Sequence, residues 1–130
     1  MFWGIPMDAI LYNRVGKPVA FLVKNEDENV ISLWNGIAVG YLFEDQIYGW
    51  NGKQLGWFID GIFYDMRGFQ VGFTRHRCPV VVTRAPAKPK QLIKGAKKLR
   101  NLPGMKPELT KKFSLLELEY LLESGRSQQA

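Results

Sequence analysis

The sequence has little of the chemistry that builds redox or metal sites. It contains one cysteine, Cys78, and one histidine, His76, in 130 residues. A single cysteine excludes an intrachain disulfide, so nothing in the chain needs an oxidising compartment and we expect a cytoplasmic location. A tetrahedral zinc site takes four ligands, and these two residues lie among arginines in "TRHRC". We therefore predict no metal site and no cofactor.

Long apolar runs are also missing. No stretch approaches the roughly 18–20 apolar residues that cross a bilayer as a helix, so we predict no transmembrane segment. The opening "MFWGIPMDAI" is apolar, but it lacks a positively charged start and is interrupted by Pro6. We interpret it as part of the fold.

Catalytic motifs are scarce as well. The chain has no G-x-S-x-G motif and no glycine-rich phosphate loop. The carboxylates Glu44, Asp45, Asp60 and Asp65 fall near predicted turns and could form an acid–base pair. Turn formation and solvation explain each of them without catalysis. We predict no catalytic residues, and a small enzyme using these carboxylates is the third hypothesis.

Positive charge is concentrated in the second part of the chain. Residues 1–80 hold seven Lys and Arg against eight Asp and Glu, whereas residues 81–130 hold eleven against four. The net charge of +6 therefore belongs to a basic tail that follows a nearly neutral body.

The body contains a fourfold repeat around glycines that recur at intervals of 16 to 20 residues. "GKPVAF", "GIAVGY", "GKQLGW" and "GFQVGF" begin at Gly16, Gly36, Gly52 and Gly68, which are typical turn positions of β-hairpins. Asn35-Gly36 and Asn51-Gly52 suit a two-residue type I′ turn, and the other two pairs suit a longer or bulged loop. The sequence therefore predicts an all-β fold of four hairpins, which must close into a shallow pseudo-fourfold barrel to bury their faces.

Strand alternation predicts which side chains face the core. The repeat positions Val19, Val39, Leu55 and Val71 are predicted to share the core face with the aromatic residues two positions later, namely Phe21, Tyr41, Trp57 and Phe73. The intervening position is always small, being Ala20, Gly40, Gly56 or Gly72. Such residues indicate a close approach of neighbouring groups, which we place at the fourfold axis.

These repeats resemble the four-fold β-flower family. The resemblance covers about residues 9–77 and depends on "LYNRVGKPVAF", "LWNGIAVGYL", "IYGWNGKQLGWF" and "GIFYDMRGFQVGF". The first unit departs from the pattern, with Arg14-Val15 in place of Trp-Asn. The resemblance implies an array of hairpin petals around an axis, and it implies a fold rather than an activity.

The tail has the composition of a linker. Residues 83–112 are rich in proline and lysine, and Gln91 to Leu102 also has a weak amphipathic helical pattern. The candidate contacts to an anionic surface are Lys90, Lys94, Lys97, Lys98 and Arg100. This segment could bind a lipid membrane or nucleic acid, or remain a solvated connection.

A short amphipathic helix is predicted at residues 113–125. Ser114 and Glu117 match a capping box, and Gly125 matches a C-terminal stop. An apolar side formed by Leu115, Leu118, Leu121 and Leu122 needs a partner, which could be the barrel, a second copy or another protein. The predicted organisation is a β-repeat domain at 1–82, the linker at 83–112, the helix at 113–125 and a disordered end at 126–130.

The favoured functional hypothesis is a non-enzymatic binding or interaction module with an unidentified ligand, whose C-terminal helix serves in docking or self-association. Aromatic residues beside the hairpin tips are candidates for an exposed ligand-binding rim, namely Trp34, Trp50, Tyr48 and Tyr64. The alternative hypothesis is a peripheral binder of lipid or nucleic acid that uses the basic tail.

Overall fold

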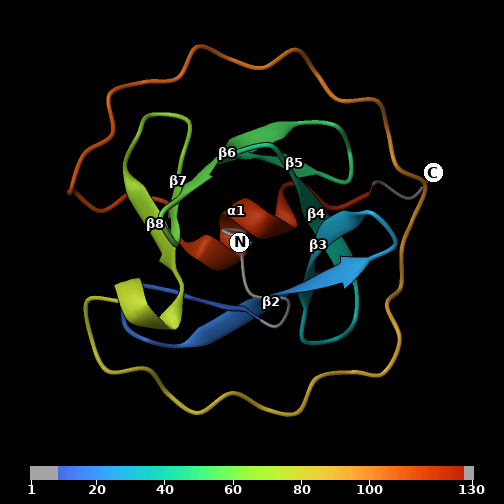
Figure 1. Cartoon of the computed structure of the whole chain (residues 1–130), viewed down its shortest axis with the longest axis horizontal. Coiled ribbons are helices and arrows are strands. Elements are labelled where there is room, and N and C mark those ends of the chain that lie inside the picture. The colour runs from blue at the N-terminus through green and yellow to red at the C-terminus, as the bar shows by residue number, and fades with distance from the viewer. Residues whose placement is uncertain (1–8, 128–130) are drawn as a thin grey trace, which may run out of the picture.

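The computed structural model describes residues 9–127. Eight antiparallel strands form a closed barrel, in which each strand pairs with the next and β8 pairs with β1 (Figure 1). The strands are β1 (Ile10–Tyr12), β2 (Pro18–Asn25), β3 (Glu28–Leu33), β4 (Ala38–Phe43), β5 (Gln46–Gly49), β6 (Gln54–Ile59), β7 (Ile62–Tyr64) and β8 (Gln70–Phe73). A 3-10 helix, η1 (Arg75–Arg77), and one α-helix, α1 (Leu118–Glu123), follow them. The predicted all-β fold of four hairpins is confirmed.

All four hairpin turns have the same geometry. The glycine amide donates to the carbonyl three residues earlier, and the glycine φ lies between +83° and +88°, in Gly16, Gly36, Gly52 and Gly68. Among residues 9–127 the non-glycine residues with positive φ are Glu26, Glu44 and Asp60, so the residue before each turn glycine has negative φ. This is the three-residue loop that ends in a left-handed glycine. The expected type I′ turn at Asn35 and Asn51 is therefore wrong, and all four hairpins use the bulged form.

A β-bulge in each unit changes the predicted assignment of faces. The register skips one residue after each turn, so Leu11 pairs with Ala20 and Tyr12 with Pro18, and Val19 is left as the extra residue. The same shift leaves out Val39, Leu55 and Val71. A bulge puts consecutive residues out of strict alternation. The four bulged residues therefore pack inside the barrel, while Tyr41 packs in a second cluster with Tyr48 and Trp50.

The predicted close approaches occur, although not all at one axis. A Cβ on Gly40 would lie 2.6 Å from the Tyr48 carbonyl oxygen of the neighbouring strand, and one on Gly56 would overlap the Tyr64 carbonyl oxygen. A Cβ on Gly72 would instead lie 3.0 Å from Leu118 of α1. Ala20 is buried in the barrel interior.

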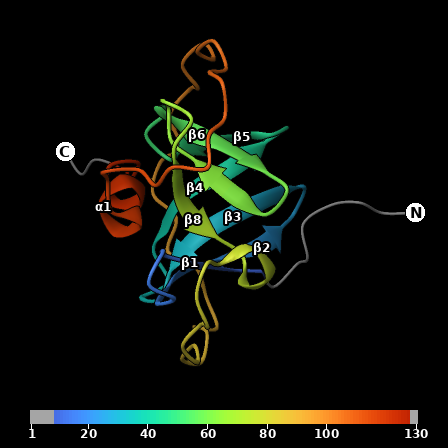
Figure 2. The same ribbon diagram turned by 90° about the vertical axis from the view of Figure 1, so that its left-hand side faces the viewer.

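The helix α1 covers one end of the barrel (Figure 2). Leu118, Leu121 and Leu122 are buried in the same cluster as Leu11, Ile31, Val39, Ile47, Leu55, Phe63 and Val71 from the strands. The apolar side of the helix therefore packs on the protein's own barrel, which was one of the three predicted partners. Leu115 does not join it and is 91% exposed.

The helix is shorter than predicted because Ser114 has another role. Its hydroxyl donates to the Asp65 carboxylate at 2.5 Å and accepts from the Leu116 amide at 3.0 Å. The N-cap position falls at Glu117, which makes no side-chain capping bond. The predicted capping box is therefore wrong, and Ser114 ties the chain before the helix to the fourth hairpin.

The segment predicted as a linker surrounds the barrel. We call residues 80–112 the belt, which makes an almost complete circuit outside the strands in an extended conformation (Figure 1). The belt contains no α-helix, since the pattern at 91–102 gives way to the single bridge between Ile37 and Ile93. Val80 to Val82 form no strand. The interpretation of residues 83–112 as a linker is corrected, because they are part of the folded domain. The predictions for residues 1–8 and 128–130 lie outside the described part of the chain.

Candidate functional site

The belt is attached to each hairpin turn in the same way. A belt amide donates to the carbonyl oxygen of each turn glycine, from Thr83 to Gly16, Ile93 to Gly36, Asn101 to Gly52 and Thr110 to Gly68, at 2.7–3.0 Å. The positive φ of the glycine turns its carbonyl out of the sheet ladder and leaves it available as an acceptor. The fourfold repeat of the hairpins therefore fixes four evenly distributed attachment points for a segment that has no visible repeat itself.

The predicted aromatic rim lies largely beneath this belt. Trp50 is 4% exposed and Tyr48 is 1% exposed. The Trp50 indole N–H donates to the Gly95 carbonyl at 2.6 Å, and the Tyr48 hydroxyl donates to the Asn101 carbonyl at 3.1 Å. Tyr64 is also buried, and Trp34 is half-buried with its ring 5.0 Å from that of Phe21. The expectation of an exposed rim is therefore wrong for Trp50, Tyr48 and Tyr64.

Several of the predicted anionic-surface cations also contact these aromatic rings. The Lys97 ammonium lies 3.9 Å from the Tyr41 ring centre and binds both carboxylate oxygens of Glu28, at 2.5 and 2.7 Å. The Arg100 guanidinium lies 3.7 Å from the Phe43 ring centre. Cation–π contacts of this kind contribute about 0.5–1 kcal/mol each at exposed sites. Lys97 and Arg100 thus help to hold the belt on the barrel.

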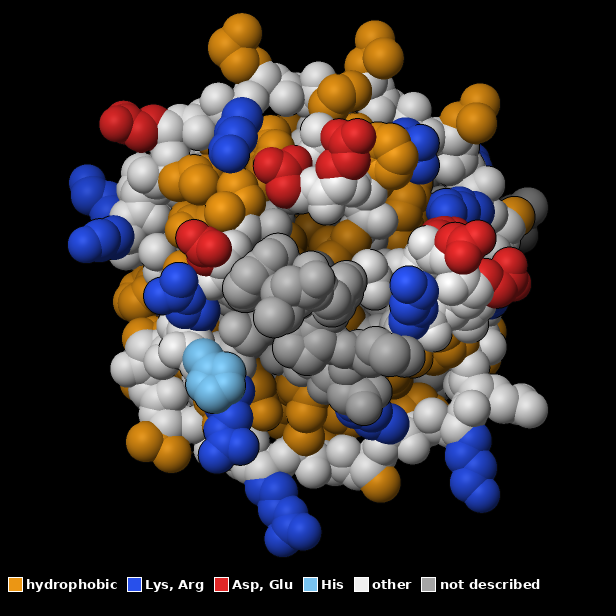
Figure 3. All heavy atoms as spheres, viewed as in Figure 1, with side chains coloured by type: hydrophobic (Ala, Val, Ile, Leu, Met, Phe, Trp, Pro, Cys, Tyr) orange, Lys and Arg blue, Asp and Glu red, His pale blue; other side chains and the backbone are white. Residues whose placement is uncertain are grey.

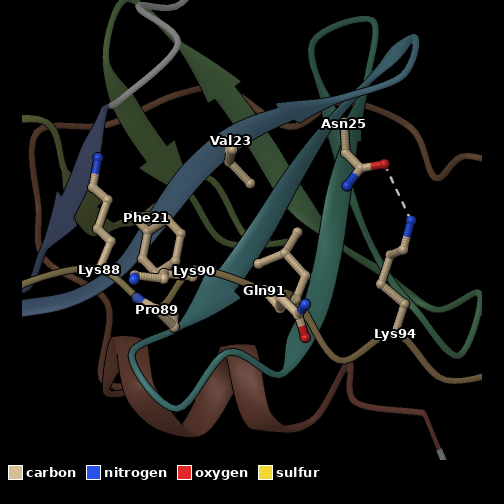
Figure 4. Close-up of a pocket in the computed structure, with 9 residues that line it drawn as sticks. Phe21, Val23, Asn25, Lys88, Pro89, Lys90, Gln91 and Lys94 are labelled. Atoms are coloured by element: carbon tan, nitrogen blue, oxygen red, sulfur yellow. Dashed lines mark hydrogen bonds between the residues drawn. The ribbon is translucent and has the colours of Figure 1, made fainter.

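A first groove lies between β2 and the belt. It has a volume of about 430 Å³, and its floor is formed by Phe21 and Val23. Figure 4 shows Lys88, Lys90 and Lys94 on the belt side, with the Lys94 ammonium donating to Asn25 Oδ1 at 3.1 Å. The groove therefore combines an apolar floor with several cations on one wall.

A second groove follows along the belt, beside β4 and β5. It has a volume of about 520 Å³ and is lined by Tyr41, Phe43 and Tyr48 on the barrel and by Lys97, Lys98 and Arg100 on the belt. Burial raises the pKa of the Tyr48 hydroxyl above its ordinary value, and the nearby Arg100 charge offsets part of this effect. Tyr48 therefore stays a neutral hydrogen-bond donor at neutral pH. Gln46 also lines this groove, and its buried Oε1 has no hydrogen-bond partner among residues 9–127.

The two grooves share one continuous basic wall, which we call the basic arc. It consists of Lys88, Lys90, Lys94, Lys97, Lys98 and Arg100, six cations in thirteen residues without an intervening carboxylate. Five of these residues were predicted from the sequence as contacts to an anionic surface, and Lys88 was not. The rigid placement of the arc over two grooves was not predicted, because it depends on belt contacts to distant turns.

The carboxylates considered for catalysis lie in three different turns: Glu44 and Asp45 between β4 and β5, Asp60 between β6 and β7, and Asp65 after β7. Asp65 is buried and accepts bonds from the Arg67 and Phe69 amides and from Ser114, so it has a structural role. His76 is exposed in η1, and the Cys78 thiol lies 3.6 Å from the Asn13 carbonyl oxygen. Residues 9–127 contain no group of three or more His, Cys, Asp or Glu side chains arranged to hold a metal ion. No helix in the same range is long and apolar enough to cross a membrane.

The architecture defines a class of small β-repeat protein, in which four bulged hairpins close into a barrel that is encircled and plugged by its own C-terminal segment. The chain belongs to the 4-fold beta flower protein family, whose model matches residues 9–122. That range includes the belt and most of α1, whereas the sequence resemblance ended near residue 77. The comparisons with curated proteins and with solved structures gave no match.

Proposed function

We propose that the protein is a non-enzymatic binding module that docks on an anionic partner through the basic arc. The observation that carries this proposal is the concentration of six belt cations along two adjoining grooves. Glu28 pairs with Lys97, whereas the Lys94 ammonium contacts the uncharged Asn25 side chain. A surface with an excess of positive charge attracts polyanions by counterion release and by long-range steering.

The belt geometry makes this surface more effective than a flexible tail would be. Its hydrogen bonds to Gly36, Trp50 and Gly52 hold residues 93–101 in place before any partner arrives. Preorganised cations lose less conformational entropy on binding than cations on a mobile segment. The role of α1 in this proposal is structural, because its leucines are occupied by the barrel core.

The experiment compares two variants of equal charge. K90Q/K94Q/K98Q removes three exposed cations of the arc, and R84Q/K111Q/K112Q removes three belt cations outside it, so each lowers the formal net charge from +6 to +3. Lys97 and Arg100 are kept because they hold the belt. Binding to anionic liposomes and to a random DNA duplex is measured at low and at high salt.

The arc variant should bind an anionic partner on the order of 100-fold more weakly, since each of its three lysines contributes about 1 kcal/mol near an anionic surface. The control variant should retain most of the affinity. Equal losses in the two variants would show that net charge alone is responsible. The absence of binding to either partner at low salt would refute the proposed function.

A further inference from the structure

The belt carries a row of exposed apolar side chains beside the second groove. Leu99 is 94% exposed, Leu102 is 92% exposed and Met105 is 94% exposed. They recur every three residues along the extended belt. We call these three residues the apolar edge. Hydrophobic side chains project from the upper border of the molecule in Figure 3, where Figure 1 places this part of the belt.

The exposure of this edge has no explanation in the folding of the barrel. Two hydrogen bonds hold the belt backbone to the barrel at this point. The Asn101 amide donates to the Gly52 carbonyl oxygen, and the Gly104 amide donates to Gln54 Oε1 at 2.7 Å. The side chains of the apolar edge are thereby directed away from the core. Nearly complete exposure of three neighbouring large apolar residues marks an interaction surface.

Charge surrounds the apolar edge in a way that selects the occupant. The run from Lys97 to Lys106 contains four cations, Lys97, Lys98, Arg100 and Lys106, and no carboxylate. The β4–β5 turn contributes Glu44 and Asp45, and Lys106 lies 3.9 Å from Asp45. Apolar side chains that project beyond adjacent cations match a bilayer, whose anionic headgroups lie outside its hydrocarbon.

We infer that the apolar edge inserts into an anionic lipid surface while the neighbouring cations of the basic arc bind the headgroups. This inference rests on the proposed function and names its partner. Nucleic acid has no apolar region that would accept the aliphatic side chains of the apolar edge. The aromatic rings that could stack on bases, such as Tyr48 and Trp50, are buried. A second copy placed edge to edge would bring two basic arcs together, which like-charge repulsion opposes.

The test uses three forms of the full chain and vesicles of phosphatidylcholine with or without phosphatidylserine. L99S/L102S/M105S removes the apolar edge, and V15S/V81S removes exposed valines at the first hairpin, where Val15 is 69% exposed and Val81 is 93% exposed. The first and third hairpins are opposite each other in a closed array of four, so the control acts on a distant part of the belt. All substituted side chains are exposed, so the variants should fold.

We expect the natural chain and V15S/V81S to sediment with phosphatidylserine vesicles and L99S/L102S/M105S to lose on the order of 100-fold in affinity. Insertion is measured independently with Leu102→Trp and Val81→Trp, using vesicles whose acyl chains are brominated. Because the natural chain already contains four tryptophans, its quenching is the baseline; quenching should exceed that baseline in Leu102→Trp and not in Val81→Trp.

The outcomes separate this inference from the proposed function. Vesicle binding that needs the arc lysines but is unchanged in L99S/L102S/M105S, with no quenching at 102, would overturn insertion and leave the anionic docking intact. Binding to duplex DNA but not to vesicles would do the same. If the natural chain binds neither anionic vesicles nor duplex DNA, both the inference and the proposed function are overturned.

Discussion

The barrel and the belt are stabilised by different kinds of contact. The barrel has continuous strand pairing and a cluster of fifteen buried apolar residues. The belt has no regular secondary structure, and most of its residues are exposed. It is held by single hydrogen bonds to turn carbonyls and by side chains such as Trp50 and Lys97. The ordered conformation of the belt therefore depends on its contacts with the barrel. We expect the local stability of the belt to be lower than that of the barrel.

The two regions also divide the charge and the chemistry. The strands supply aromatic rings to their outer side, and the belt covers those rings while presenting lysines and arginines to solvent. An antiparallel sheet that is apolar on both faces needs a cover on each. Here α1 covers the end of the interior and the belt covers the outside, so one short chain supplies both covers after its last strand.

The largest effect should come from the helix that completes the barrel core. Leu122→Ala removes a fully buried side chain from the main cluster, and we expect it to lower the free energy of unfolding by about 2–5 kcal/mol. Leu115→Ala is the control because that side chain is 91% exposed, and its effect should be within about 0.5 kcal/mol. Urea unfolding of the full chain measures both. Similar values for the two variants would show that α1 is not part of the cooperative core.

The attachment of the belt can be tested with a matched pair of turn glycines. Gly36 and Gly52 have the same φ of +88°, so alanine imposes the same backbone strain, roughly 1–2 kcal/mol, at both positions. A Cβ at 52 would overlap the Leu99 carbonyl oxygen, whereas one at 36 would lie 3.0 Å from the Gln91 carbonyl oxygen. Gly52→Ala should therefore cost about 1–3 kcal/mol more than Gly36→Ala.

That difference should appear as opening of the belt, and limited trypsin digestion at Arg100 measures it. Faster cleavage is expected in Gly52→Ala than in Gly36→Ala. If both variants are cleaved at the same rate and unfold at the same urea concentration, the belt is not in close contact with the third turn.

The hairpins could be predicted because their signals are local. Each turn glycine lies within a few residues of the strands it connects, and the same short sequence pattern occurs four times. The bulges at Val19 and Val39 could not be seen, since they are defined by the register between strands. The belt was missed for a related reason: its hydrogen bonds go to Gly16, Gly52 and Gly68, far away in the chain, and its own composition is that of a linker.

One signal for the belt was nevertheless present in the sequence. Strands such as "IYGW" and "VGYL" are apolar on both faces, which requires an outer cover, and the tail is the longest segment outside the hairpins. Buried tyrosine and tryptophan also need partners for their polar atoms. Tyr48 and Trp50 find theirs in the belt carbonyls of Asn101 and Gly95. The prediction of an exposed rim did not take into account that these polar atoms need hydrogen-bond partners.

The smallest predicted effect isolates one bond between the two regions. Trp50→Phe removes the indole N–H that donates to the Gly95 carbonyl, whereas Trp34→Phe removes a buried indole N–H that has no hydrogen-bond partner in the described part of the chain. Both substitutions replace an indole by a phenyl ring, and Trp50 is the more deeply buried of the two, so the loss of stability in Trp50→Phe should exceed that in Trp34→Phe by at least about 1 kcal/mol. Hydrogen exchange at the Lys98 amide, which donates to the Trp50 carbonyl at 2.9 Å, reports local release of the belt. Exchange should accelerate in Trp50→Phe and stay unchanged in Trp34→Phe, and equal rates in the two variants would mean that the indole bond does not hold the belt in place.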